Sequence, residues 1–200
     1  MIINYQTQPE KDILDAATTL FANQGYHNTT IREVTEFAKL SNSMLNYYFR
    51  TKENLLQTIL KIIYEKQNNE KIRGKAIERL SKYIDSIIEH ILSEEDYVKI
   101  IFQENLQNIN PEIKKIINQI FTLHKNQFLS IINHGISIGE FQSNINADIL
   151  YYYAVGTLKY FFEFNSLAGN NPSELFFSEL KNIKKSVITH LEKDLLSESD

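Results

Sequence analysis

Apolar side chains recur at spacings of three and four residues along most of this chain, which is the period of an α-helix and not the alternation of a strand. Only six glycines and three prolines interrupt the 200 residues. The first apolar segment places its residues on one helical face, at Ile13, Leu14, Ala17, Leu20 and Phe21. The pattern predicts an all-α protein.

The first third of the chain predicts short helices with clear starts. We expect the first helix over residues 9–24, with Gly25 ending it. Three N-cap signals then follow in quick succession: a capping box made by Thr30 and Glu33, and single caps at Ser41 and Thr51. These caps predict three short, angled helices, the last beginning at residue 52.

Beyond this region the predicted helices lengthen, and Pro111, Gly139 and Pro172 mark breaks between them. The chain contains no internal repeat and no low-complexity linker. We therefore expect two packed parts, residues 7–67 and 68–200, that differ in helix style. The expected longer helices span residues 55–67, 76–92, 96–107, 112–138, 148–167 and 173–195.

Two of the short helices have the arrangement of a helix-turn-helix, in which the second helix enters the major groove of DNA. The expected motif spans residues 30–49, with Lys39 and Leu40 in the turn. Asparagine can pair with adenine, serine can bond several bases, and tyrosine hydroxyls suit phosphate oxygens. Such side chains lie on the expected exposed face of the second helix, at Asn42, Ser43, Asn46 and Tyr47.

Composition narrows the range of functions. With no cysteine, the chain has no disulfide, no thiolate nucleophile and no cysteine-ligated metal. A net charge of -4 and a pI near 5.8 argue against a broadly basic surface, so any DNA contact must use a local patch. Basic residues do concentrate around the helix-turn-helix, at Arg32, Lys39, Arg50 and Lys52.

The sequence contains no constellation typical of an enzyme or a metal site. It lacks a nucleophile and base, or paired carboxylates, at recognisable catalytic spacing. His90, His124 and His134 fall in expected long helices without forming a metal-binding cluster. We expect no enzyme activity, no cofactor and no metal.

Several linked features between Ile13 and Leu56 point to one family. The first helix ends in LFANQGY, the next starts with TTIREV, and the segment from Leu45 to Phe49 is followed by Arg-Thr-Lys-Glu at residues 50–53. In these features the first third of the chain resembles the DNA-binding domain of TetR-type transcriptional regulators. The resemblance implies a helix-turn-helix domain followed by a helical bundle for ligand binding and dimerisation.

The resemblance also implies roles by position. Arg32 would reach a base or a phosphate. The groove would be faced by Ser41, Asn42, Ser43 and Asn46, and the phosphate backbone would be held by Tyr47, Tyr48 and Lys52, the lysine assisted by the dipole of its helix. The chain departs from the family pattern at Lys39, where glycine is usual, at Met44 and at Asn46.

The remaining helices are rich in apolar and aromatic residues that admit two interpretations. Aromatic residues such as Phe121, Phe128, Tyr152 and Tyr160 either line a pocket for a small apolar or aromatic effector or belong to the core and interfaces. The apolar stripe of the last helix either packs within one chain or joins the helix at 148–167 in a four-helix dimer interface. That stripe comprises Phe176, Leu180, Ile183, Val187, Leu191 and Leu195.

Taken with the resemblance, these patterns predict a homodimeric, ligand-responsive repressor that binds a palindromic DNA operator. The alternative is a helical ligand- or protein-binding module that has lost DNA binding. The chain shows neither a signal peptide nor an apolar run long enough to cross a membrane, so we expect a cytoplasmic protein without a membrane partner.

Overall fold

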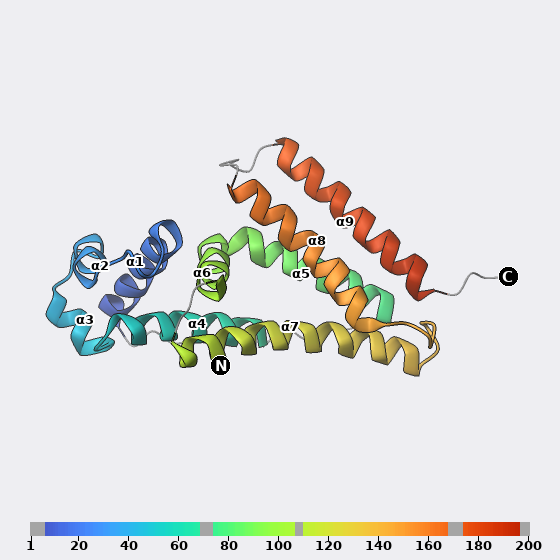
Figure 1. The fold of residues 1–200 in the computed structure, drawn as a ribbon, viewed down its shortest axis with the longest axis horizontal. Helices are drawn as coiled ribbons and strands as arrows, with labels where there is room; N and C mark the ends of the chain where they lie inside the picture. The colour runs from blue at the N-terminus through green and yellow to red at the C-terminus, as the bar shows by residue number, and fades with distance from the viewer. Residues whose placement is uncertain (1–6, 69–73, 107–109, 168–173, 197–200) are drawn as a thin grey trace. The chain divides into compact units, whose positions relative to one another are not determined.

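The computed structural model describes residues 7–68, 74–106, 110–167 and 174–196. These residues form helices and no strand, which confirms the expectation of an all-α protein (Figure 1). Within them, no helix is both long and apolar enough to span a bilayer. The helices are α1 (Gln8–Gln24), α2 (Ile31–Phe37), α3 (Asn42–Tyr48), α4 (Lys52–Asn68), α5 (Ala76–Ser93), α6 (Glu95–Leu106), α7 (Pro111–Ser137), α8 (Ala147–Leu167) and α9 (Glu174–Leu195).

Where the structure describes them, the observed helix ends lie within a residue or two of the predicted ones, with one exception; the ends predicted at residues 107 and 173 and the break predicted at Pro172 lie outside the described residues. The expected short helix at residue 52 and the expected helix at 55–67 are a single helix, α4. The hydroxyl of Thr51 accepts a hydrogen bond from the backbone N–H of Asn54 at 3.0 Å, so the predicted cap is present. No glycine or proline follows it within α4, and the helix therefore continues for 17 residues.

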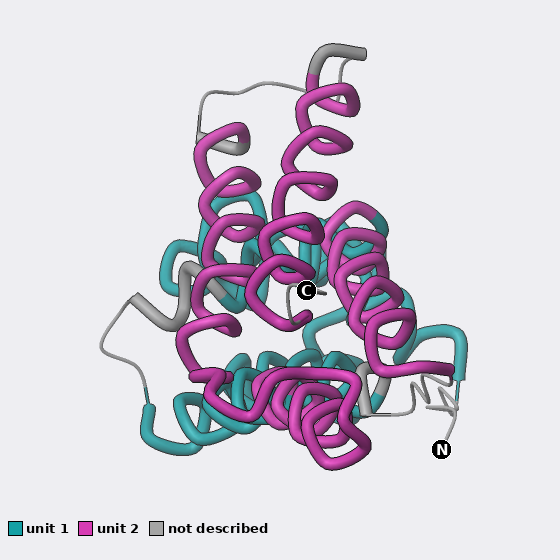
Figure 2. Tube along the Cα trace, turned by 90° about the vertical axis from the view of Figure 1, so that its right-hand side faces the viewer, with its two compact units in different colours: residues 1–70, 93–123 teal, residues 71–92, 124–200 magenta. Residues whose placement is uncertain are grey.

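The helices divide between two compact units (Figure 2). The first unit comprises residues 1–70 and 93–123, and the second comprises residues 71–92 and 124–200. Helix α7 contributes its first half to one unit and its second half to the other. The unit that holds the short helices also includes α6 and the first half of α7. The domain boundary predicted at residues 67 and 68 stays a prediction.

The core of the first unit holds the short helices in place. Helix α1 packs against α2, α3, α4 and α6. Phe21 of α1, Val34 of α2 and Leu45 of α3 are all fully buried in one apolar cluster. Leu45 is the only fully buried residue of α3, and the partly buried Tyr48 also packs against this core, so α3 is held to the unit along one side while Asn42, Ser43, Asn46 and Tyr47 stay exposed.

The core of the second unit shows which way the apolar stripe of the last helix, α9, faces. Five of the six stripe residues, namely Phe176, Leu180, Val187, Leu191 and Leu195, are at most 7% exposed and pack in the same cluster as α5 and α8 residues, and the sixth, Ile183, is partly buried against that cluster. The stripe therefore packs within its own chain. The alternative, in which this stripe faces a second copy, is wrong because the residues are already covered.

A partly buried histidine makes the second unit sensitive to acid. The backbone carbonyl of His124 accepts a hydrogen bond from the Tyr83 hydroxyl at 2.9 Å. Burial of the His124 ring, with the nearby His90 as a smaller contribution, lowers the pKa of His124 from 6.5 to about 4. In the folded protein this ring therefore stays neutral at mildly acidic pH.

We expect this histidine to reduce stability as the pH falls below 6.5. The unfolded chain, with its ordinary histidine pKa, then binds a proton that the folded chain does not, so acid favours unfolding. Between pH 7 and pH 5 the free energy of unfolding should fall by about 1–2 kcal/mol from this group alone. Urea denaturation of the wild type and of His124→Gln at both pH values checks this, and an equally steep fall in the variant would contradict it.

Candidate nucleic-acid interface

Helix α2 begins with the predicted capping box. The Thr30 hydroxyl accepts from the backbone N–H of Glu33 at 3.2 Å, and the Glu33 carboxylate accepts from the backbone N–H of Thr30 at 2.7 Å. The bond from the Thr30 backbone is also the main reason that the pKa of Glu33 is lowered. Both ends of this reciprocal pair satisfy backbone donors that the first turn would otherwise leave unpaired.

The turn between α2 and α3 is a Schellman motif. The backbone N–H of Lys39 donates to the Glu36 carbonyl at 3.2 Å, and that of Leu40 donates to the Thr35 carbonyl at 2.9 Å. This geometry needs a left-handed residue directly after the helix cap, and Lys39 supplies it with φ at 56°. For a residue other than glycine such a conformation costs about 1–2 kcal/mol. The Ser41 hydroxyl then caps α3 by accepting from the N–H of Met44 at 3.3 Å.

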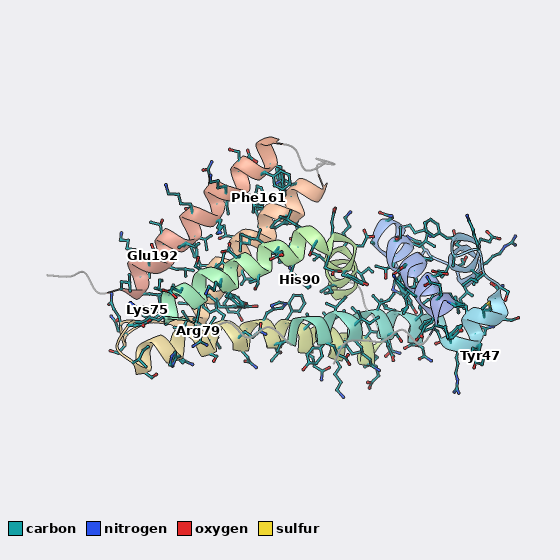
Figure 3. All side chains as sticks on the ribbon, turned by 180° about the vertical axis from the view of Figure 1, so that it is seen from behind. Tyr47, Lys75, Arg79, His90, Phe161 and Glu192 are labelled. Atoms are coloured by element: carbon teal, nitrogen blue, oxygen red, sulfur yellow. The ribbon has the colours of Figure 1, made fainter. Side chains whose placement is uncertain are left out.

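The exposed face of α3 carries the side chains that the sequence assigned to it. Asn42, Ser43, Asn46 and Tyr47 are exposed; Ser43 and Tyr47 lie on the side of α3 opposite to the buried Leu45, and Asn42 and Asn46 lie at the edges of that face. Tyr47, labelled in Figure 3, is 80% exposed. The structure brings these four residues together on one short helix, while their contact with DNA stays a prediction.

The two asparagines of this face differ in what they can still bond. The side-chain carbonyl of Asn42 accepts from the Thr35 hydroxyl at 2.6 Å, so part of the bonding capacity of the Asn42 amide is already used within the protein. Asn46 has no side-chain partner among the described residues and keeps both its donor and its acceptor. Asn46 is therefore the better candidate for a paired contact with adenine. Sequence reasoning missed Thr35, because its position gives no sign that its hydroxyl reaches across the turn.

Arg32 is exposed and already bonded. Its Nε donates to the Glu36 carboxylate at 2.7 Å within α2, and this bond raises the pKa of Arg32. Exposed ion pairs of this kind are weak and are screened by salt. Arg32 can therefore exchange Glu36 for a phosphate or a base at little cost.

Tyr48 and Lys52 are tied into the first unit. The Tyr48 hydroxyl accepts from the Thr7 hydroxyl at 2.8 Å. The Lys52 ammonium donates to the backbone carbonyls of Tyr26 and Thr29, both at 2.8 Å, and lies 4.2 Å from the centre of the Tyr26 ring. Lys52 therefore fastens the start of α4 to the connection between α1 and α2. Its predicted grip on a phosphate stays a prediction.

Comparisons with known proteins agree with this geometry. Residues 13–59 match the family model described as "Bacterial regulatory proteins, tetR family". Residues 73–174, which are more than half of the chain, match the model "Tetracyclin repressor-like, C-terminal domain". The chain belongs to the TetR family of bacterial regulatory proteins. It is accordingly a DNA-binding transcriptional regulator and not an enzyme, as its sequence predicted.

Among relatives of this TetR-family chain are regulators named for fatty acid metabolism. The "Fatty acid metabolism regulator protein" of Bacillus subtilis (strain 168) is 25% identical over 151 residues, covering 73% of this chain and 77% of the relative. The crystal structure of the B. subtilis regulator FadR in complex with stearoyl-CoA aligns with a TM-score of 0.67 at 22% identity, over 90% of this chain and 96% of that one. A putative fatty acid metabolism regulator of Clostridium perfringens aligns with a TM-score of 0.72 at 19% identity, over 94% of this chain and 100% of that one. At such identities the structures show a shared fold.

The aromatic residues predicted to line an effector pocket differ in their burial within this TetR-family fold. Phe128 is fully buried in the second unit, where its ring lies 5.6 Å from that of Tyr151. Tyr152 and Tyr160 are 62% and 69% exposed on α8. Phe121 packs against the core of the first unit. Their role in ligand binding stays a prediction.

Proposed function

We propose that this TetR-family chain is a dimeric, ligand-responsive repressor that reads an inverted repeat in DNA through α2 and α3. The observation that carries the proposal is the construction of α3. The buried Leu45 holds the helix against the core, and the exposed residues of the helix present amide, hydroxyl and phenol groups to solvent. Capped ends on α2 and α3 hold that face rigidly, as recognition of base edges requires.

The second copy would pack against α8. This helix exposes a stripe of large apolar residues, each 59–69% exposed, at Ile149, Tyr152, Tyr160 and Phe164. Their spacing places them along one face of α8, and a continuous exposed apolar surface of this kind is typical of a protein interface. Gly156 lies in the middle of the stripe, and a Cβ there would meet nothing within 4 Å. A glycine exposed inside a helix costs about 1 kcal/mol relative to alanine, which close approach of a partner helix would explain.

A dimer formed through α8 has two recognition helices related by a two-fold axis. Such a dimer would place them about one turn of DNA apart, roughly 34 Å. The operator should then be an inverted repeat. A protein that acts on bacterial DNA would work in the cytoplasm.

The effector would be a small, largely apolar molecule bound in the second unit. The buried rings of Tyr83, Phe128 and Tyr151 provide an apolar environment there. The B. subtilis regulator of similar fold was solved with stearoyl-CoA, so a long-chain acyl thioester is the first compound to test. To release the operator, the effector need only bind more tightly to a dimer whose recognition helices no longer match the operator spacing.

The proposed DNA surface predicts the effect of two substitutions. An operator is first selected from a pool of random duplexes with the wild-type protein. Arg32→Ala and Tyr47→Ala should each weaken binding to that operator by about 10- to 100-fold, because each removes its contact from both copies in the dimer. Fluorescence anisotropy titrations give the affinities, and sedimentation should show unchanged dimers.

Lys61→Ala is the matched control. Lys61 is exposed on α4, nine residues or about 13 Å along the helix from Lys52. Its replacement removes the same charge as Arg32→Ala from the same unit. Affinities of Arg32→Ala and Tyr47→Ala equal to that of Lys61→Ala would contradict the proposed surface.

A further inference from the structure

Both helices of the helix-turn-helix end on a basic residue in the left-handed region. Lys39, after α2, has φ at 56°, and Arg50, after α3, has φ at 64°. They are the only residues other than glycine with positive φ among the described residues. The two residues thus lie on either side of α3, one before its start and one after its end.

Each residue occupies a defined helix-ending position. Lys39 is the left-handed residue of the Schellman motif described above. Arg50 plays the same part in a simpler motif, because its backbone N–H donates to the Asn46 carbonyl at 3.1 Å, four residues back. Both bonds are made by the backbone, so neither motif requires the lysine or arginine side chain. Glycine fits such positions with the least strain.

The side chains at these positions are exposed and available. Neither Lys39 nor Arg50 has an ion pair or a side-chain hydrogen bond within the part of the chain that the structure describes. The other cations of the motif are engaged, since Arg32 bonds Glu36 and Lys52 bonds two carbonyls. Lys39 and Arg50 therefore carry the unengaged positive charge beside the exposed face of α3, in a chain whose net charge is -4.

We propose that Lys39 and Arg50 are phosphate contacts that bracket the recognition helix. This assignment rests on the proposed DNA surface and extends it by two residues. A strained backbone position that keeps a free cation, where glycine would fit better, is explained if the charge itself is used. Contacts to phosphates on both sides of α3 would set its position in the groove without reading sequence.

Salt dependence tests the assignment directly. Each phosphate contact contributes about 0.9 to the slope of log affinity against log salt, and a dimer uses each residue twice. Lys39→Gly and Arg50→Gly should each reduce the slope by about 2 with a labelled 30-base-pair duplex of mixed sequence, measured from 50 to 200 mM salt. In urea denaturation both variants should be at least as stable as the wild type. Lys39→Arg should keep the slope, and Lys61→Gln, which removes a charge from α4, should leave it unchanged.

The outcomes separate the possible failures. If the wild type binds and the glycine variants keep its slope, Lys39 and Arg50 are not phosphate contacts, while the proposed α3 surface stands. A purely structural role, such as interaction of the cations with the helix C-termini, predicts lower stability with an unchanged slope and overturns the assignment in the same way. If the wild type fails to bind any duplex at 50 mM salt, both the assignment and the proposed function are wrong.

Discussion

Gly156→Arg is expected to convert the dimer to monomers and to lower operator affinity by at least 100-fold. Within one protomer a Cβ at this exposed position meets nothing within 4 Å, so the variant should fold as the wild type does. Across the proposed interface, however, an arginine would occupy the space of the partner helix and bring a charge into the apolar stripe between Tyr152 and Tyr160. A monomer engages one half-site only and loses the gain that comes from linking two.

Sedimentation velocity and anisotropy titrations measure both effects on the same samples. Ser186→Arg is the control because it adds the same side chain at an exposed position of α9. Ser186 lies on the side of α9 opposite to Phe177, which is the exposed large apolar residue of that helix among the described residues. The control should remain dimeric and bind DNA normally. A dimeric Gly156→Arg protein would show that α8 does not form the interface.

Leu45→Ala should strongly lower the stability of the first unit. Leu45 is fully buried and is the one residue of α3 whose side chain lies wholly within the core. Removing a buried leucine side chain costs about 2–5 kcal/mol of unfolding free energy, since apolar contact is lost and a cavity is left. Because no other residue of α3 is buried, we also expect the helix to lose its fixed orientation and DNA affinity to fall.

Urea denaturation, followed by circular dichroism, measures the loss. Met44→Ala, at a half-buried neighbouring position, is the matched comparison and should cost clearly less. Equal losses for the two variants, or full DNA affinity in Leu45→Ala, would show that α3 is held by something other than Leu45.

The parts of the fold that were predictable from the sequence are those encoded locally. Thr30 with Glu33 and Ser41 mark helix starts through bonds that span three residues, so their spacing alone located α2 and α3. Apolar periodicity likewise located the long helices. The same local reasoning divided α4 in two, because Thr51 was read as the cap of a short helix while nothing after it stops the helix.

Features that depend on contacts between helices were not predictable. The α9 stripe has the same periodicity whether it faces its own core or a second copy, and only packing shows that Val187 and Leu191 are covered. The engagement of Lys52 with the carbonyls of Tyr26 and Thr29 depends on how α4 meets the connection before α2. The use of the Asn42 carbonyl by Thr35 depends in the same way on the turn between α2 and α3.

The central claim is that the chain binds DNA through a surface with little net positive charge. The most direct test is a titration of the wild-type protein into labelled mixed-sequence duplex DNA at 50 and 200 mM salt. We expect binding at the lower concentration and a loss of affinity of about 10³-fold or more at the higher one, as for a dimer that neutralises at least six phosphates. Absence of binding even at 50 mM salt would contradict the account and favour a helical module that no longer binds DNA.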